Sequence, residues 1–382
     1  VFPVPAYARN WRLSDRQALG WGLTASGLKS SAAGGSASLS RGVPTFSASC
    51  EGGFGGGQPV DANPDLRGLC GRSGKKLGVD LTQLLLSAFY AYRVDASLSL
   101  GIEPVFAAQR VQLRGLGAFA AFSNQPQNTT DNDFDYSWGG GVRLGLLWEP
   151  ADGLAFGAAY QSRLTQSEFA RYQGAIVGGS LDFAPTLNLG AQIHFLPGQR
   201  LIFDLEQIGF ADVTPLAKQV EPQRFSDECF VPRILARSPN PAPLSACLGG
   251  KTGPGFGWRD VTVYKIGYQS RLGNRTLRAG FSWGGNPVNS GQVLSRFFAP
   301  PISDKHAAIG YAWKRPNGAR IHLALTHAIN HSIREKNVFS NAQLSLLQGT
   351  LVGIRVVPDA QDQVVESSLR VWQLHVTYAW AP

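Results

Sequence analysis

The stretch Trp372-Gln-Leu-His-Val-Thr-Tyr-Ala-Trp380 alternates large apolar residues with polar or small ones. Side chains of a β-strand point alternately to its two faces, so one face here is apolar and the other carries Gln373, His375 and Thr377. Aromatic residues lie toward the end of the apolar face, where they suit the boundary between a membrane and water. The stretch therefore predicts a strand with one face toward lipid and the other toward a polar interior.

The same two-residue period recurs along the whole chain and is clear in segments 136–150, 183–197 and 275–288. Strands in soluble sheets usually have about 5–6 residues, whereas most of these segments are long enough to cross a membrane at a tilt. The chain is therefore predicted to be all-β, a single antiparallel transmembrane β-barrel domain over residues 1–382. Thirteen strands are expected, at 2–12, 17–27, 82–94, 97–114, 136–150, 153–172, 183–197, 199–213, 258–272, 275–288, 303–316, 319–333 and 363–380.

Short and long connections alternate between these strands. The short ones, such as Asp95-Ala96, Gly198-Gln199 and Gly273-Asn274, contain residues that tolerate the positive φ of tight hairpins. Short turns at the periplasmic end and long loops outside are typical of outer-membrane barrels. The predicted location is the bacterial outer membrane, with long external loops at 28–81, 115–135, 214–257 and 334–362.

Composition agrees with a barrel and argues against other classes. Hydrophobic residues make up 43% and charged residues 16%, yet no apolar run reaches the roughly 18 residues of a spanning helix. The net charge is +9, but Lys and Arg are scattered one per strand or loop and form no basic patch for nucleic acid. The positive charge instead favours anionic outer-membrane lipid and lipopolysaccharide, or carboxylate ligands.

The four cysteines form two close pairs within predicted loops. Proximity favours disulfides Cys50–Cys70 and Cys229–Cys247, with free buried thiols as the alternative. No His lies near them at metal-ligand spacing, so neither a metal nor a cofactor is expected. The histidines are strung along strands without a local Ser/His/acid arrangement, so an enzyme is not expected either.

Several motifs occur in a characteristic order. They are Leu181-Asp-Phe-Ala-Pro-Thr-Leu-Asn-Leu-Gly190, Trp258-Arg-Asp260, Leu277-Arg-Ala-Gly280, Asn286-Pro-Val288 and Pro301-Ile-Ser-Asp-Lys-His306. Their order and spacing resemble the long-chain fatty-acid and aromatic-hydrocarbon transporters of the outer membrane (FadL/TodX type). The resemblance implies a monomeric fourteen-stranded barrel that is plugged by an N-terminal hatch. This chain lacks the hatch with its Asn-Pro-Ala sequence, so one further strand and a hatch are expected before Val1 of the intact protein. The chain also ends in Trp380-Ala-Pro382 instead of a terminal aromatic.

The resemblance further implies passive uptake of small hydrophobic molecules that external loops capture. By position, Arg114 and Arg259 resemble the family's carboxylate-binding residues. The alternative is that they form ordinary ion pairs in the lumen with acids such as Glu103 or Glu206. Leu116, Phe119 and Phe122 have roughly helical spacing in a loop and would line the capture groove, or else pack the loop onto the barrel rim.

Lateral release through the barrel wall is the route that the resemblance implies. The matching strand carries Gly20, Gly22, Ser26 and Gly27, and a bend at Ser26-Gly27 would form the gate. The alternative is that these glycines only relieve crowding in a curved wall. A polar-solute porin and a structural or adhesion barrel remain competing functions. The residues do not identify the substrate, which could be a fatty acid, an alkane, a terpenoid or an aromatic compound.

Overall fold

The computed structural model describes residues 5–31, 78–114, 122–236, 242–288, 303–336 and 364–380. The strands within these ranges form one antiparallel sheet of 14 strands. Thirteen of the strands are long, as the sequence predicted, and the all-β barrel fold is confirmed. The long strands are β1 (Ala6–Arg12), β2 (Gln17–Ser31), β3 (Gly78–Arg93), β4 (Leu98–Arg114), β5 (Asp135–Ala151), β6 (Leu154–Gln161), β8 (Thr186–Leu196), β9 (Gln199–Ile208), β10 (Val261–Leu272), β11 (Arg275–Gly284), β12 (Lys305–Lys314), β13 (Arg320–Lys336) and β14 (Val364–Ala379).

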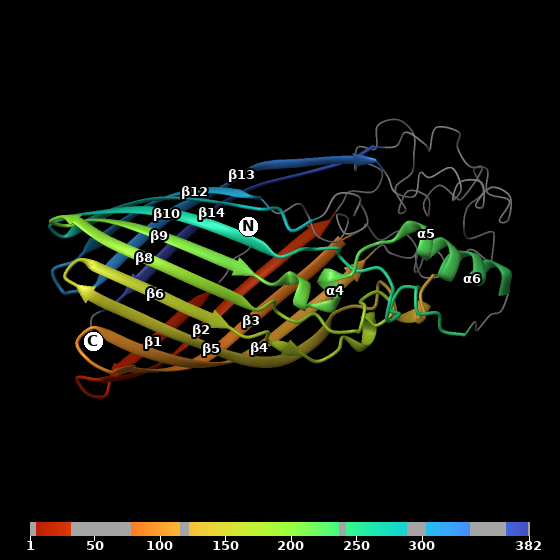
Figure 1. Ribbon diagram of the computed structural model, residues 1–382, viewed down its shortest axis with the longest axis horizontal. Helices are drawn as coiled ribbons and strands as arrows, with labels where there is room; N and C mark the ends of the chain where they lie inside the picture. Colours follow the sequence, from red (N-terminus) through yellow and green to blue (C-terminus); the bar gives the residue numbers. More distant parts are fainter. Residues whose placement is uncertain are drawn as a thin grey trace.

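Strands that follow one another along the chain are neighbours in the sheet, which curls into the wall of a barrel (Figure 1). The fourteenth strand, β7 (Thr165–Gln166), has two residues and pairs with β5, while β6 pairs with β8. The first and last strands run in the same direction, because each strand between them reverses the chain. Close to these two edges, the ring centroids of Tyr7 and Trp380 lie 5.8 Å apart.

The two faces of the wall differ as the two-residue period predicts. On β14, Trp372, Leu374 and Val376 are 59%, 71% and 66% exposed, so their apolar side chains cover the outer surface. On β4, burial alternates along the strand, with Val105, Ala107 and Val111 buried on the inner face. Exposed apolar side chains would be unfavourable in water, whereas a barrel surrounded by lipid requires them.

Tight turns close one end of the barrel and longer connections lie at the other (Figure 1). Gly198 and Gly318 have φ values of +75° and +82° in two of the tight turns, a conformation that other residues rarely adopt. The long-connection end carries helices α4 (Thr214–Ala217), α5 (Pro222–Phe225) and α6 (Val231–Ala236) and the π-helix η5 (Ser226–Phe230). No helix among the described residues has the length and apolarity to cross a membrane.

The two largest differences from the predicted strand ends are in the segments 153–172 and 199–213. The segment predicted as strand 153–172 leaves the sheet after Gln161, at the end of β6, and returns only briefly as β7. The segment predicted as strand 199–213 ends at Ile208, followed by the 3-10 helix η4 (Phe210–Asp212). In both places the apolar residues beyond the strand are buried by packing inside the molecule instead of facing lipid. The 3-10 helices η2 (Pro126–Asn128) and η3 (Ala170–Tyr172) complete the described helices.

Candidate functional site

The connection between β6 and β8, residues 162–185, packs against the inner face of the wall, and we call it the inward segment. Leu164 and Phe183 form an isolated antiparallel bridge. Leu164 is fully buried and packs with Val105 and Ala107, whose side chains face inward from β4. Further along, Phe169, Tyr172 and Ile176 of the inward segment join a cluster with other inward-facing residues of β3 and β4. The interior is therefore occupied by apolar side chains at this level.

Tyr172 anchors the inward segment to the β4–β5 connection. Its hydroxyl donates a hydrogen bond to the carbonyl oxygen of Asp133, at 2.5 Å. Asp131 and Asp133 have φ values of 57° and 59°, so this turn holds two residues in the left-handed region. Burial raises the pKa of Tyr172 to about 12, because the phenolate would lose its hydration.

A row of polar side chains also joins the wall to the inward segment. Ser26 Oγ donates to Gln83 Oε1 at 3.2 Å, and Gln83 Nε2 donates to Gln109 Oε1 at 3.3 Å. Gln109 Nε2 then donates to the carbonyl oxygen of Leu181 at 2.7 Å. This row fixes the position of the inward segment relative to β2, β3 and β4.

The outer surface of the wall is hollowed beside Pro104. The β3–β4 ladder has no paired residues between Ala88–Phe89 and Glu103–Pro104, although the register is the same on both sides. Proline has no N–H to donate, so it interrupts a ladder in the interior of a sheet. A cavity of about 690 Å³ lies at this point. Its lining is mostly apolar: Trp21, Leu86, Ser87, Ala88, Pro104, Val105, Phe106, Gly139 and Gly140.

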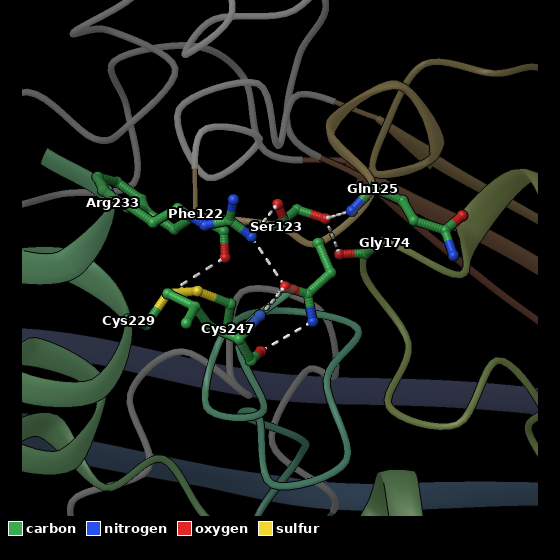
Figure 2. The surroundings of a disulfide bond; sticks show 9 residues. Phe122, Ser123, Gln125, Gly174, Cys229, Arg233 and Cys247 are labelled. Atoms are coloured by element: carbon green, nitrogen blue, oxygen red, sulfur yellow. Dashed lines mark hydrogen bonds between the residues drawn. A yellow bond between two sulfur atoms is a disulfide. The ribbon is translucent and has the colours of Figure 1, made fainter. Parts of the chain in front are cut away.

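The long-connection end carries a compact unit held by a disulfide, as the sequence predicted for Cys229 and Cys247 (Figure 2). The two sulfurs are bonded, and both cysteines are fully buried in a cluster with Phe225 and Ala246. The Cys229 sulfur lies 3.5 Å from the carbonyl oxygen of Phe122, a contact that is not a hydrogen bond because a disulfide sulfur carries no proton.

Arg233 of α6 joins this unit to the β4–β5 connection (Figure 2). Its Nη2 donates to Asn124 Oδ1 at 2.8 Å. Asn124 Oδ1 also accepts from the Leu244 backbone N–H at 2.8 Å, and Asn124 Nδ2 donates to the Leu244 carbonyl at 2.9 Å. Burial lowers the pKa of Arg233, yet the guanidinium stays protonated because arginine begins so high. Cys50 and Cys70 lie outside the described residues.

Residues 70–191 match the family model for an outer membrane protein transport protein (OMPP1/FadL/TodX). Solved structures that share the fold include two toluene transporters and a FadL homologue. The P. putida toluene transporter TodX has a TM-score of 0.59 and 15% identity, covering 99% of this chain and 82% of its own. The chain has the β-barrel fold of the FadL/TodX type. The Ralstonia pickettii toluene transporter TbuX has a TM-score of 0.54 and 16% identity, and the match covers 99% of this chain and 81% of TbuX. A Pseudomonas aeruginosa FadL homologue has a TM-score of 0.56 and 14% identity, and the match covers 98% of this chain and 78% of the homologue.

A comparison with curated protein sequences finds no match. The FadL/TodX-type barrel nevertheless combines the family match with a fold that agrees over nearly its whole length. The matched family consists of outer-membrane transport proteins, and the chain is accordingly a bacterial outer-membrane β-barrel.

The structure places the predicted basic residues of this FadL/TodX-type barrel far apart in its sheet. Arg114 ends β4, opposite Gly78 of β3. Arg259 precedes β10 and is exposed, and its Nε donates to the carbonyl oxygen of Asn286 at 3.2 Å. The lumen acids that were considered as their partners bind other cations: Glu103 pairs with Arg143 at 3.1 Å and Glu206 with Lys265 at 2.7 Å.

The predicted capture residues are only partly within the described residues. Leu116 and Phe119 lie outside them. Phe122 is half-buried and packs edge-to-face on Phe225, with ring centroids 6.0 Å apart. This contact joins the β4–β5 connection to helix α5.

The predicted gate residues lie on a regular strand. β2 pairs with β3 without a register shift from Gln17 to Ser31. On its other side, β2 pairs with β1 from Ala18 to Thr24. Gly20 lies under the ring of Phe89, which leaves no room for a Cβ atom, whereas Gly22 has space. The wall is interrupted instead at the β3–β4 pairing beside Pro104, which proline's missing N–H could have indicated from the sequence.

Proposed function

We propose that this chain is a passive channel for small hydrophobic molecules, either hydrocarbons or fatty acids, which leave the interior through the barrel wall. The observation that carries the proposal is that apolar side chains lie on both the inner and the outer face of the wall beside Pro104. Val105 lines the outer cavity and also packs against Leu164 of the inward segment. One backbone position therefore separates an apolar interior from an apolar hollow that opens toward lipid.

This arrangement favours an apolar ligand over a polar one. A hydrocarbon gains about 25 cal/mol for each Å² of surface removed from water, so it partitions from the interior into the hollow and then into the bilayer. The side chains of Leu164, Phe169 and Tyr172 in the inward segment are fully buried and offer few polar groups to a hydrated solute. The similar structures named as toluene transporters agree with this class of ligand.

The entry route in this proposal starts at the external loops. Leu116, Phe119 and Phe122 would contribute apolar surface for capture, and Arg114 and Arg259 would attract a carboxylate where the ligand carries one. Both Arg114 and Arg259 adjoin connections at the external end, which is compatible with first contact there. No chemical conversion of the ligand is involved.

The exit route in this proposal uses β2 to β5. Trp21 of β2 lines the hollow together with residues of β3, β4 and β5. Gly20, Gly22, Ser26 and Gly27 belong to the same strand and would let it shift slightly against its neighbours, because glycine tolerates backbone conformations that other residues avoid. The missing pairs beside Pro104 lower the cost of separating β3 from β4.

Filling the hollow tests the exit route. Ala88 lines the hollow and its side chain is exposed on the outer face, so Ala88→Phe would occupy the space without adding volume to the interior. We expect uptake of a radiolabelled hydrocarbon or medium-chain fatty acid by cells that lack other such channels to fall at least about fivefold, which corresponds to roughly 1 kcal/mol on the barrier.

The matched control is Ala279→Phe, which adds the same side chain to an exposed position of β11, on another part of the wall. It should assemble and transport like the unmodified protein. Equal uptake by both variants, at equal amounts of folded protein, would exclude exit beside Pro104. A large ohmic conductance in planar bilayers would favour the polar-solute porin instead.

A further inference from the structure

The tight-turn end of the lumen holds a group of basic side chains that the proposed function does not use. Their register places them on the inner face of five consecutive strands, β9 to β13, and we call them the basic cluster: Arg200, Arg271, Arg278, Lys314, Arg320 and His322. They surround a small cavity of about 130 Å³. None of the described residues that line this cavity is acidic.

The geometry of the basic cluster holds several donors close together. Arg200 Nη2 and Arg278 Nε both donate to Gln269 Oε1, at 2.9 Å and 2.8 Å. Two guanidinium groups are thereby brought onto one amide oxygen, although like charges repel. The Nε atom of Arg200 is buried and has no hydrogen-bond partner among the described residues. A buried donor without a partner is unfavourable, and an arriving acceptor would remove that cost.

His322 adds a neutral donor to the basic cluster. Arg278 Nη1 lies 3.2 Å from His322 Nδ1. Because arginine can only donate, Nδ1 accepts and the imidazole proton is on Nε2. His322, which also lines the cavity, therefore keeps one N–H group without adding another charge.

Two other cations of the lumen are paired with acids. Lys265 binds Glu206 at 2.7 Å further from the tight turns, on the same strands β9 and β10, and Arg143 binds Glu103 at 3.1 Å. The basic cluster departs from this arrangement, and its cavity has the size for one small group.

We propose that the basic cluster is a binding site for an oxyanion, a carboxylate or a phosphate group, at the tight-turn end of the lumen. Guanidinium groups bind these planar or tetrahedral oxyanions with paired, charge-assisted hydrogen bonds. The site goes beyond the proposed passage of hydrophobic molecules, because an uncharged hydrocarbon needs no cation. It would hold the head group of an amphipathic acid that passes through the barrel, or a free oxyanion from the surrounding water.

Isothermal titration calorimetry of the full chain in an uncharged detergent tests the site. Octanoate, butyrate and inorganic phosphate are the anionic probes, and octanol is the neutral counterpart of octanoate. We expect saturable anion binding that weakens with added salt, because screening reduces attraction between exposed charges. Octanoate binding more tightly than butyrate and phosphate identifies the head group of an amphipathic acid. Equal binding of all three anions identifies a free oxyanion, and both results support the site.

Substitutions locate the binding. Arg200→Gln combined with Arg278→Gln should weaken anion binding at least about tenfold, the effect expected from removing charged hydrogen bonds from a partly buried site. Arg93→Gln is the matched control, an arginine at the tight-turn end of β3 that lies outside the cluster, and it should leave affinity unchanged. If the double variant does not fold, Thr276→Glu places a carboxylate in the cavity and should abolish binding. No saturable binding by the unmodified protein, or equal binding by Thr276→Glu, would overturn the proposal. Hydrocarbon uptake is measured separately, so either proposal can fail alone.

Discussion

Arg143 of β5 donates a hydrogen bond from Nη1 to Glu103 Oε1 of β4, at 3.1 Å, and the two residues lie directly opposite each other in the sheet. Their side chains are 32% and 26% exposed, so water screens the pair only partly. Glu103 immediately precedes Pro104, where the β3–β4 ladder is interrupted. The ion pair therefore holds β4 to β5 on the side opposite the missing pairs.

Removing one member of this pair should destabilise the barrel more than removing both. We expect Arg143→Gln to cost about 1–2 kcal/mol, because Glu103 stays behind without its cation, and the double variant with Glu103→Gln to recover part of that loss. The coupling energy should be about 1 kcal/mol, discounted for the remaining exposure. Urea unfolding followed by the electrophoretic shift of folded barrels measures it, with Glu149→Gln on the same strand as the control. Additive effects would show that the pair is not coupled.

The disulfide Cys229–Cys247 should matter for the external unit and little for the barrel. It closes a sequence separation of 18 residues, which in the chain-entropy model is worth about 3 kcal/mol to that unit. In Cys229→Ser/Cys247→Ser, trypsin should cleave sooner after Arg224, Arg233 or Lys251, while the barrel keeps its resistance and its electrophoretic shift. Unchanged cleavage at these sites would mean that the buried cluster around Phe225 holds the unit without the disulfide.

Tyr172 predicts an alkaline limit for the packing of the inward segment. Its folded-state pKa of about 12 lies above the ordinary value of 10.0, so the neutral phenol stabilises the fold below about pH 10. That contribution, roughly 2 kcal/mol, is lost as pH rises through 12, because the unfolded segment ionises first. Proteolysis of residues 162–185 should therefore accelerate between pH 10 and 12 in the unmodified protein. Tyr172→Phe should be less stable than the unmodified protein at pH 8, but its rate of proteolysis should change less with pH above pH 10. Tyr136→Phe, with its exposed ring, should behave like the unmodified protein.

The strands were predictable because their information is local. A residue of β14 faces lipid or lumen according to its position in a two-residue period, and that period is visible without any knowledge of neighbouring strands. The fate of the apolar residues after Gln161 was not predictable in the same way. Leu164, Phe169 and Tyr172 are apolar enough for a lipid-facing strand, but the structure buries them inside the wall, and a single sequence does not distinguish the two surroundings.

The basic cluster shows a second limit of local reasoning. In the sequence, Arg200, Arg278 and Arg320 look like scattered charges, one for each strand. Hairpins that return the chain to the same end of the barrel bring them together, and only the strand register reveals that all three lie close together across neighbouring strands. The predicted disulfide Cys229–Cys247, by contrast, depended on short separation and was correct.

Two glycines of β2, predicted together as part of a gate, should respond differently to substitution. A Cβ atom on Gly20 would lie 2.6 Å from the carbonyl oxygen of Arg9 and closer still to the ring of Phe89. The ring could move but the backbone of β1 could not, so Gly20→Ala should cost about 1–3 kcal/mol through overpacking. A Cβ atom on Gly22 would be 3.5 Å from Ser87 Oγ, an ordinary contact, so Gly22→Ala should change stability by less than about 0.5 kcal/mol. Thermal unfolding of both variants measures the difference, and adding Phe89→Leu to Gly20→Ala should restore only the part due to the ring. Equal melting temperatures for Gly20→Ala and Gly22→Ala would mean that β1 yields at Arg9, which would in turn favour a mobile β1–β2 edge.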